Sequence, residues 1–496
     1  MSETDVLPIF HVVGFTGHRQ VDNAAGLEQA LHQALAKLKS EPGVEWLALS
    51  SVAVGGDMIF ARSALALGFG WEAMLPLPPA EFRHDFEEGD WRVVQGLLAE
   101  AEQVRVLSQR PERDEAYLDC GMETVNACDV LLAVWDGEPA RGRGGTAEIV
   151  AYARELGRPL IVVDARTFDV RRENFSELKL GDRHLAFLNR LPSVPPKPGE
   201  EGADDDPGRR HLRTFQRKVD RSATLGAPHF RRLITLTVCL HVLATAIAAT
   251  AVCFRLNAVE LPWGKLFCLV GALVGAMVLG HHRDRHDWVR CRLAAEIARS
   301  AIATWGIPRT LRLFEDFDWA GLEPFRRSLD VLHRRSARSH PIAFDRFKQR
   351  YLAQRIDDQL AYFARQEAKA IPQLARLRWG FFVSTLLAIG FTAVYAAHTF
   401  TPAAPVPRWE SSWIFDFGPI VLPVLAAGFL SLVSINDLHR REARYREMRI
   451  RLGAARKEAA FVQTWGALER VVAKAERALL QEVFEWHSIT SFSESH

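Results

Sequence analysis

The pattern of apolar and polar residues divides the chain into two halves. Up to about residue 190, short apolar runs alternate with longer stretches whose apolar residues recur every three to four positions. Short runs rich in β-branched and aromatic residues are typical of buried strands, and the periodic stretches are typical of helices. The expected strands are residues 9–13, 46–49, 71–75, 104–107, 130–135 and 160–163. The expected helices between them are residues 26–39, 58–67, 91–101 and 147–156. This alternation predicts an α/β Rossmann-like domain over residues 1–190, with a parallel sheet between two layers of helices.

Beyond residue 230 the apolar runs become long. Four of them, residues 233–254, 266–280, 379–400 and 417–435, contain no Asp, Glu, Lys or Arg. At about 1.5 Å per residue the first run can cross a hydrocarbon core of roughly 30 Å. Trp263 and a snorkelling Lys265 would extend the second run to bilayer thickness. Buried core helices would explain one short run but not two pairs, so the sequence predicts an all-α four-span transmembrane bundle with long cytosolic helices.

The remaining segments connect these parts. Residues 191–230 combine a linker rich in Pro, Gly and acidic residues with a basic juxtamembrane segment. The transmembrane hairpins are expected at 231–282 and 376–437, a cytosolic helical region at 283–375, and a second one at 438–496. CRLAAEIARSAIATWG after the first hairpin resembles IRLGAARKEAAFVQTWG after the second. Duplication of a two-span unit explains this better than chance similarity between basic helices.

Charge sets the expected orientation. The chain has 62 Lys and Arg against 60 Asp and Glu, a net charge of +2, which excludes a strongly basic protein that binds nucleic-acid polymers. Arginine is concentrated beside the apolar runs, whereas the two hairpin loops hold only Arg255, Lys265 and Arg408 as basic residues. By the positive-inside rule both termini and the central region should be cytosolic. The N-terminus lacks the pattern of a secretory signal, and no CxxC pair suggests a metal site.

Two glycine-containing loops follow the first two expected strands. Gly14, Thr16, Gly17 and Arg19 follow the first, where glycines let the backbone approach a phosphate, Thr16 offers a hydroxyl and Arg19 a bidentate guanidinium. A tight strand-to-helix turn with an exposed arginine is the alternative. Gly55, Gly56 and Asp57 follow the second strand and open a helix. Asp57 is expected at or near the helix N-cap, a stabilising role that needs no ligand, while the glycine amides stay able to bind one.

A third loop follows the strand at 130–135 and carries the largest group of candidate residues. They are Asp136, Arg143, Gly144, Gly145, Thr146 and Glu148. Free amides at a helix N-terminus form an anion site, and Arg143 adds positive charge. Glu148 is either an acid that stabilises the helix dipole or an acceptor for a ribose or base, and Asp136 has the same two interpretations. Neither GxxxxGK[ST] nor GxGxxG occurs in the chain.

Four motifs in order, GFTGHR, SSVAVGGDMIFARSALALG, LPLPPAEFRHDF and DVLLAVWDG followed by GRGGTAEIVAYARELGRPLIVV, resemble the SLOG superfamily of Rossmann-like nucleotide-binding domains over about residues 8–165. The resemblance implies that the following residues face the ligand: Gly14, Thr16, Gly17, Arg19, Gly55, Gly56, Asp57, Gly144, Gly145, Thr146 and Glu148. The LOG-type phosphoribohydrolases of this superfamily carry PGGxGTxxE. GRGGTAE lacks that proline and has a different glycine spacing, which argues for binding rather than hydrolysis.

The second half resembles the SLATT group of two-span effector domains, which accompany SLOG domains in bacterial antiphage defence. The features that carry this resemblance are a basic helix after each hairpin, WVRCRLAAEIARS, and YLAQRIDDQLAYFARQ before the second hairpin. It implies a homo-oligomeric sensor-effector in the bacterial inner membrane, which binds a cyclic oligonucleotide or an ADP-ribose-type second messenger and disrupts the membrane. No resident cofactor is expected. The alternative is a membrane-tethered nucleotide N-glycosidase or phosphoribohydrolase, in which Glu148 or Asp136 stabilises an oxocarbenium-like transition state.

Overall fold

A computed structural model describes residues 5–40, 43–107, 112–139, 143–178, 181, 183–195, 206–256, 260–279, 282–308, 322–400, 412–435 and 438–492. The chain forms two compact units. The first holds the N-terminal residues up to Arg190, the short segment Asp206–Leu212, and helix α11 (Glu323–Ser339). The second holds the remaining helices. The expected cytosolic region at 283–375 is therefore divided between the two units.

A single sheet organises the first unit. Its strands are β1 (Ile9–Gly17), β2 (Val44–Ser50), β3 (Gly70–Leu75), β4 (Gln103–Val106), β5 (Val130–Trp135), β6 (Leu160–Asp164) and β7 (Val170–Glu173). They lie in the order β4-β3-β2-β1-β5-β6-β7. All neighbouring pairs from β4 to β6 are parallel, and β7 is antiparallel to β6. The predicted parallel α/β sheet is confirmed, and β7 is an addition that the sequence did not predict.

Helices cover both faces of this sheet. They are α1 (Ala24–Lys39), α2 (Gly56–Ala66), α3 (Pro79–Phe82), the short turn η1 (Arg83–Asp85), α4 (Glu88–Glu100), α5 (Arg113–Ala127), α6 (Thr146–Glu155), the short turn η2 (Phe175–Glu177) and α7 (Arg183–Asn189). The two faces follow from the alternation of side chains along each strand. Val13 and Phe15 of β1 face one core with α1, α2 and α4, whereas Phe10 and Val12 face a second core with α5 and α6.

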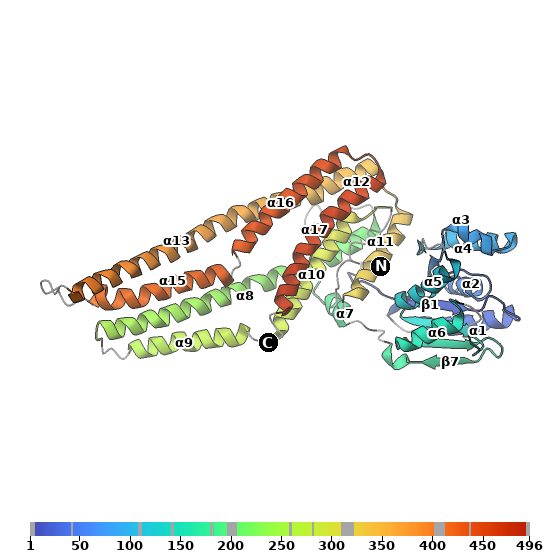
Figure 1. The fold of residues 1–496 in the computed structure, drawn as a ribbon, viewed down its shortest axis with the longest axis horizontal. Coiled ribbons are helices and arrows are strands. Elements are labelled where there is room, and N and C mark those ends of the chain that lie inside the picture. The colour runs from blue at the N-terminus through green and yellow to red at the C-terminus, as the bar shows by residue number, and fades with distance from the viewer. Residues whose placement is uncertain are drawn as a thin grey trace. The chain divides into compact units, whose positions relative to one another are not determined.

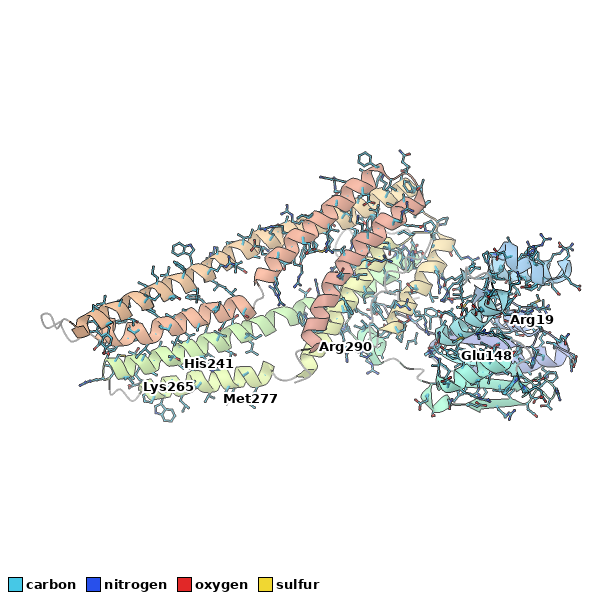
Figure 2. The ribbon with its side chains drawn as sticks, in the orientation of Figure 1. Arg19, Glu148, His241, Lys265, Met277 and Arg290 are labelled. Atoms are coloured by element: carbon cyan, nitrogen blue, oxygen red, sulfur yellow. The ribbon has the colours of Figure 1, made fainter. Side chains whose placement is uncertain are left out.

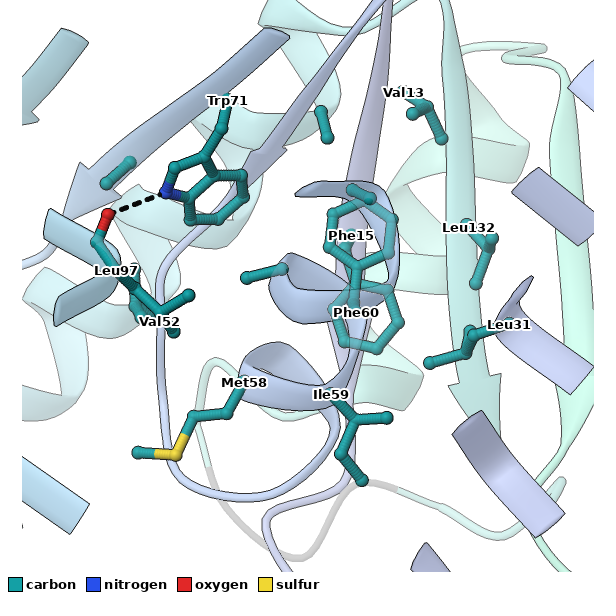
Figure 3. Close-up of a cluster of buried hydrophobic side chains, with 14 of the residues drawn as sticks. Val13, Phe15, Leu31, Val52, Met58, Ile59, Phe60, Trp71, Leu97 and Leu132 are labelled. Atoms are coloured by element: carbon teal, nitrogen blue, oxygen red, sulfur yellow. Dashed lines mark hydrogen bonds between the residues drawn. The ribbon is translucent and has the colours of Figure 1, made fainter. Parts of the chain in front are cut away.

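The first of these cores is dense in aromatic rings. Phe15 of β1 stacks on Phe60 of α2 with ring centroids 4.6 Å apart (Figure 3). The indole nitrogen of Trp71 donates to the carbonyl of Leu97 over 3.0 Å, so the buried polar atom of this large ring is satisfied (Figure 3). Burying a side chain such as Phe60 contributes about 1.5–3 kcal/mol. This core fixes α2, and with it the loop that precedes α2, against the end of β1.

Helices alone make up the second unit. They are α8 (Pro207–Cys253), α9 (Glu260–Leu279), α10 (His282–Thr304), α12 (Phe344–Tyr351), η3 (Leu352–Asp357), α13 (Asp358–Phe400), η4 (Ser412–Phe417), α15 (Gly418–Ile435), α16 (Leu438–Phe461) and α17 (Trp465–Phe492). The segments η3 and η4 have π-helical geometry. Helix α8 starts with residues of the first unit and continues unbroken into the second.

Four helices of this unit are long and apolar enough to cross a membrane. The apolar stretches are Leu233–Cys253, Glu260–Val278, the C-terminal part of Phe344–Ala397, and Ser412–Ser434. Helices α8, α9, α13 and α15 run side by side (Figure 1). Large apolar side chains point away from them, with Trp263 67% exposed and Phe267 76% exposed. Such exposed apolar surface is unfavourable in water and favourable in a lipid environment.

Glycines allow close approach between the apolar helices. A Cβ atom added at Gly275 of α9 would lie 2.6 Å from the hydroxyl oxygen of Thr237 on α8. A Cβ atom at Gly428 of α15 would lie 3.0 Å from a methyl carbon of Val242, also on α8. In a lipid environment, apolar burial does not favour contact between helices over contact with lipid. Small residues at the interface let the helix backbones approach closely enough for van der Waals packing. Because α8 contacts both α9 and α15, the two hairpins belong to one bundle.

The Thr-Trp-Gly tripeptide that occurs after each hairpin has two different structures. In the first copy Thr304 ends α10, Trp305 is buried, and Gly306 has a φ of +96°. In the second copy Trp465 begins α17, with Gly466 inside the helix. The shared tripeptide therefore does not mark a shared turn, although each hairpin is followed by a long helix.

A buried ion pair lies in the helical core formed by α12, η3, α13, α16 and α17. Arg355 donates from Nε and Nη2 to the two carboxylate oxygens of Glu476, over 2.9 and 2.7 Å. The hydroxyl of Tyr351 also donates to this carboxylate, over 2.9 Å. Arg355 is 4% exposed and Glu476 is completely buried. Removing one partner would leave an uncompensated charge inside the helical core.

Candidate functional site

The sheet order creates a switch point between β1 and β5. From β1 the chain proceeds outward through β2, β3 and β4, and then returns to β5 on the other side of β1. In open α/β sheets, ligands bind outside the carboxyl ends of the strands at such a point. Thr16 and Gly17 at the end of β1 pair with Ala133 and Val134 of β5. The predicted loops after these two strands therefore begin side by side.

The residues of the first motif have different surroundings. Gly14 lies inside β1, and a Cβ atom there would lie 2.9 Å from Cβ of Cys128 and 3.0 Å from a methyl carbon of Thr124. This glycine makes room for the adjacent helix α5 and its C-terminal residue. Thr16 and Gly17 are half-buried in the last positions of β1, and Arg19 is exposed. The exposed end of this motif, beginning at Thr16, is the part available to a ligand.

The loop before α2 holds the β1 loop in place. Gly55 has a φ of +92°, which side chains rarely permit. A Cβ atom at Gly55 would lie 2.2 Å from the carbonyl oxygen of Arg19 and 2.9 Å from that of His18. The amide of Gly56 donates to the carbonyl of His18 over 3.1 Å. Glycine at position 55 thus lets the backbone that carries Arg19 rest directly on the start of α2.

Asp57 stabilises the end of β2. It lies in the first turn of α2, whose N-cap is Gly55, and its side chain is buried. Ser50 and Ser51 donate hydroxyl hydrogen bonds to its carboxylate over 2.7 and 2.8 Å. Burial raises the pKa of Asp57 to about 6, although the two serines lower it. These contacts give Asp57 a structural role in fixing the loop.

The third loop packs against α5. Gly144 has a φ of +74°, and a Cβ atom there would lie 2.8 Å from the backbone nitrogen of Leu118. The amide of Gly144 donates to the carboxylate of Glu148 over 2.8 Å. A Glu in the first turn that reaches back to an amide before the helix is a capping interaction. This contact matches the stabilising interpretation of Glu148.

Around this cap lie the other residues of the third loop. Gly145 is the N-cap of α6, and Thr146 is the buried first residue of the helix. Arg143 is exposed, with its guanidinium 3.8 Å from the carboxylate of Glu115 on α5. An exposed ion pair of this length contributes little to stability, so Arg143 can turn toward an anion at small cost. The N-terminus of α6 and one adaptable arginine thus meet at the same edge of the sheet.

Asp136 connects the β5 loop to the β1 loop through His18. The Nε2 atom of His18 lies 3.2 Å from the backbone nitrogen of Asp136 and 3.3 Å from its Oδ1. The carboxylate of Asp136 also accepts a hydrogen bond from the amide of Glu138 over 3.1 Å, and its side chain is only 8% exposed. Both carboxylates considered for catalysis, Asp136 and Glu148, are therefore engaged in holding their own loops.

An aromatic ring that the sequence interpretation missed completes the site. The guanidinium of Arg19 lies 4.7 Å above the ring of Tyr117 on α5. The hydroxyl of Tyr117 donates to Asp85, which also pairs with Arg113 over 2.5 Å. Burial and this carboxylate raise the pKa of Tyr117. No sequence motif contains Tyr117, because its position beside Arg19 depends on the order of the strands in the sheet. His18, in contrast, belongs to the GFTGHR motif and could have been identified from the sequence.

Figure 2 labels Arg19 and Glu148 in the first unit, and His241, Lys265 and Met277 along the apolar helices of the second. Among the described residues, no group of three or more His, Cys, Asp or Glu side chains could hold a metal ion.

Comparison of the sequence with models of protein families and with curated proteins finds no match. The functional argument therefore depends on the geometry of the site and on the four apolar helices.

Proposed function

We propose that this protein is a membrane-anchored sensor-effector whose first unit binds a nucleotide-derived second messenger. The observation that carries the proposal is the switch point between β1 and β5, where Arg19, the glycine-supported loop and the N-terminus of α6 converge. Helix N-termini and arginine side chains both bind phosphate readily. The exposed face of the site fits a ligand that carries both phosphate and an aromatic base.

Each group at this edge has a role in the proposed complex. Arg19 leaves the Tyr117 ring to form a bidentate contact with phosphate, and the amides of Gly145 and Thr146 bind the same charge. The ring of Tyr117 then offers its face to a base, since aromatic stacking contributes about 1–3 kcal/mol per base. Binding rather than catalysis is favoured because Asp136 and Glu148 are held by hydrogen bonds within their own loops. Ligands of the cyclic oligonucleotide and ADP-ribose classes both carry the required groups.

The four apolar helices would be the effector. They would cross the bacterial inner membrane with both termini in the cytosol, and ligand binding would favour one arrangement or oligomer of the bundle. None of the apolar runs carries Asp, Glu, Lys or Arg, which argues against ion-coupled transport and favours disruption of the membrane. This organisation agrees with the resemblance to SLOG and SLATT domains and with a role in antiphage defence.

Mass spectrometry of nucleotides that copurify with the full-length protein in detergent tests the sensor part. The wild type should retain a phosphate-bearing nucleotide, and Arg19→Ala should lose it, because the charge-assisted contact is removed. Lys37→Ala, a basic residue on α1 outside the site, is the control and should retain it. Equal retention by the wild type and Arg19→Ala would overturn the assignment of this site. Release of free base from NAD or a nucleoside monophosphate, abolished by Glu148→Gln, would instead support the enzymatic alternative.

A further inference from the structure

Helix α11 lies against the sheet of the first unit although the sequence places it between the two apolar hairpins. Its buried side chains include Phe325, Leu329 and Val331, which are at most 1% exposed. Val331 belongs to the same core cluster as Phe10 and Val12 of β1. The contact is therefore an integral part of the domain core and not a surface association of two exposed faces.

Polar contacts place α11 across the amino ends of the strands, opposite to the candidate site. Ser328 donates to the carbonyl of Pro8, just before β1, over 2.6 Å. Arg327 donates to the carbonyl of Phe10 in β1 over 3.2 Å, and also forms an ion pair with Asp129, the residue before β5. One guanidinium thus joins the amino ends of the same two strands whose carboxyl ends form the switch point.

The other strands present acidic residues to the same helix. Arg334 pairs with Glu72 of β3 over 2.5 Å, and Arg335 pairs with Glu45 of β2 over 2.9 Å. Glu72 is only 2% exposed, and although burial would raise its pKa, Arg334 and Arg105 hold it below the usual value. A row of acidic side chains on the sheet edge is therefore matched by a row of arginines on α11. Charge complementarity of this kind specifies one register of the helix.

The chain connects α11 closely to the second unit. Only residues 340–343 separate the end of α11 from α12, whose Phe347 and Tyr351 are buried in the helical core of the second unit. The connection from α11 to a segment anchored in that core is thus only four residues long. Strands β1 and β5 lead from the candidate site to the residues that Arg327 contacts.

We infer that α11 is a coupling helix. The amino edge of the sheet is a docking surface for this basic helix, and changes at the carboxyl ends of β1 and β5 alter how tightly the helix is bound there. The inference relies on the proposed function only for the trigger, since the contact itself needs no ligand. Coupling between two sites is reciprocal, so a perturbation of the candidate site must change the stability of the α11 contact, and a perturbation of that contact must change the site. A helix that merely completes the fold would respond only as much as the rest of the domain does.

Hydrogen exchange of the full-length protein in detergent, after any copurifying nucleotide has been removed, tests the inference. Gly55→Ala disturbs the β1 loop at the opposite edge, and should change the exchange of α11 amides about fivefold or more, the lower end of typical coupling. Gly157→Ala is the matched control, because Gly157 also has a positive φ, +65°, but no atom lies within 4 Å of an added Cβ. Unchanged exchange in α11 with Gly55→Ala would overturn the inference.

The reciprocal measurement keeps the test decisive if Gly55→Ala does not fold. Arg327→Ala removes the contact to β1 and β5, and should change exchange of the loop residues 17–20 by a similar factor. Arg326→Ala is its control, because Arg326 pairs with Glu323 and Asp330 of its own helix. Equal exchange of the loop in both variants would overturn the inference. Because no ligand is present, either result is independent of whether a nucleotide binds the site.

Discussion

Replacement of Gly55 by alanine is the most direct perturbation of the site that leaves every charged residue in place. The residue has φ +92° and ψ −119°, a backbone conformation that costs a side chain about 1–3 kcal/mol. The new Cβ atom would lie 2.2 Å from the carbonyl oxygen of Arg19, where ordinary contacts begin near 3.4 Å. The Arg19 backbone must therefore retreat by roughly 1 Å to restore van der Waals contact.

This displacement should weaken the binding of a phosphate-bearing nucleotide. A hydrogen bond to a charged group is worth about 1.5–3 kcal/mol, and 1.4 kcal/mol is a factor of ten in affinity. Loss of the Arg19 contact thus predicts roughly 10- to 100-fold weaker binding. Isothermal titration of the detergent-solubilised protein, with the nucleotide found to copurify with the wild type, measures this change.

Gly157→Ala supplies the matched control for this titration. It also places a side chain at a positive φ in the same domain but without a steric contact, so the nucleotide should bind it as it binds the wild type. Both variants should be titrated at a temperature below their unfolding transitions, which are measured by thermal melting. If Gly55→Ala binds the nucleotide as tightly as Gly157→Ala does, the reasoning that Gly55 positions Arg19 is refuted.

Three further predictions concern stability. The folded pKa of Asp57 is raised to about 6 from 3.8, so its favourable contribution to stability is present below pH 3.8 and lost as the pH rises through 6. Asp57→Asn should therefore flatten the pH dependence of thermal unfolding between about pH 4 and 6, and should gain up to about 3 kcal/mol at pH 8. Glu476→Gln removes the carboxylate that pairs directly with the buried Arg355 and should cost about 3–5 kcal/mol by denaturant unfolding. Glu458→Gln, in an exposed pair, should cost less than about 1 kcal/mol. Gly275→Val should lower the melting temperature in detergent because its Cβ meets α8, with a cost of about 1–3 kcal/mol, while Gly390→Val, which meets no atom within 4 Å, should not. Equal effects of a variant and its control, or an unchanged pH profile for Asp57→Asn, would contradict the corresponding prediction.

Local patterns were sufficient for most of the architecture. The six expected strands are present, and all but the edge strand β4 are largely buried, as apolar, β-branched runs in a parallel sheet should be. Helix α5 was missed because its buried face includes the polar Thr124 and the small Cys120, which weaken the helical pattern. Strand β7 was missed because three of its four residues are charged, as suits an exposed edge strand.

The candidate site was predictable in its loops but not in its contacts. The glycines and Arg19 could be assigned to loops from the strand pattern alone, whereas the engagement of Asp136 and Glu148 by nearby amides depends on exact backbone turns. Tyr117 and α11 are distant in sequence from the loops they affect, and no periodicity reports which strand a helix will meet. Long-range pairs such as Arg327 with Asp129 appear only once the fold is known.

Dye release from proteoliposomes tests the central claim that a nucleotide bound in the α/β unit controls the apolar bundle. The full-length protein would be reconstituted in vesicles of bacterial lipids that contain a self-quenched dye, and the copurifying nucleotide would be added outside. The account predicts release that depends on nucleotide concentration with the wild type and is shifted to higher concentration with Gly55→Ala but not with Gly157→Ala. Release that is absent, or that is the same with and without nucleotide, would contradict it.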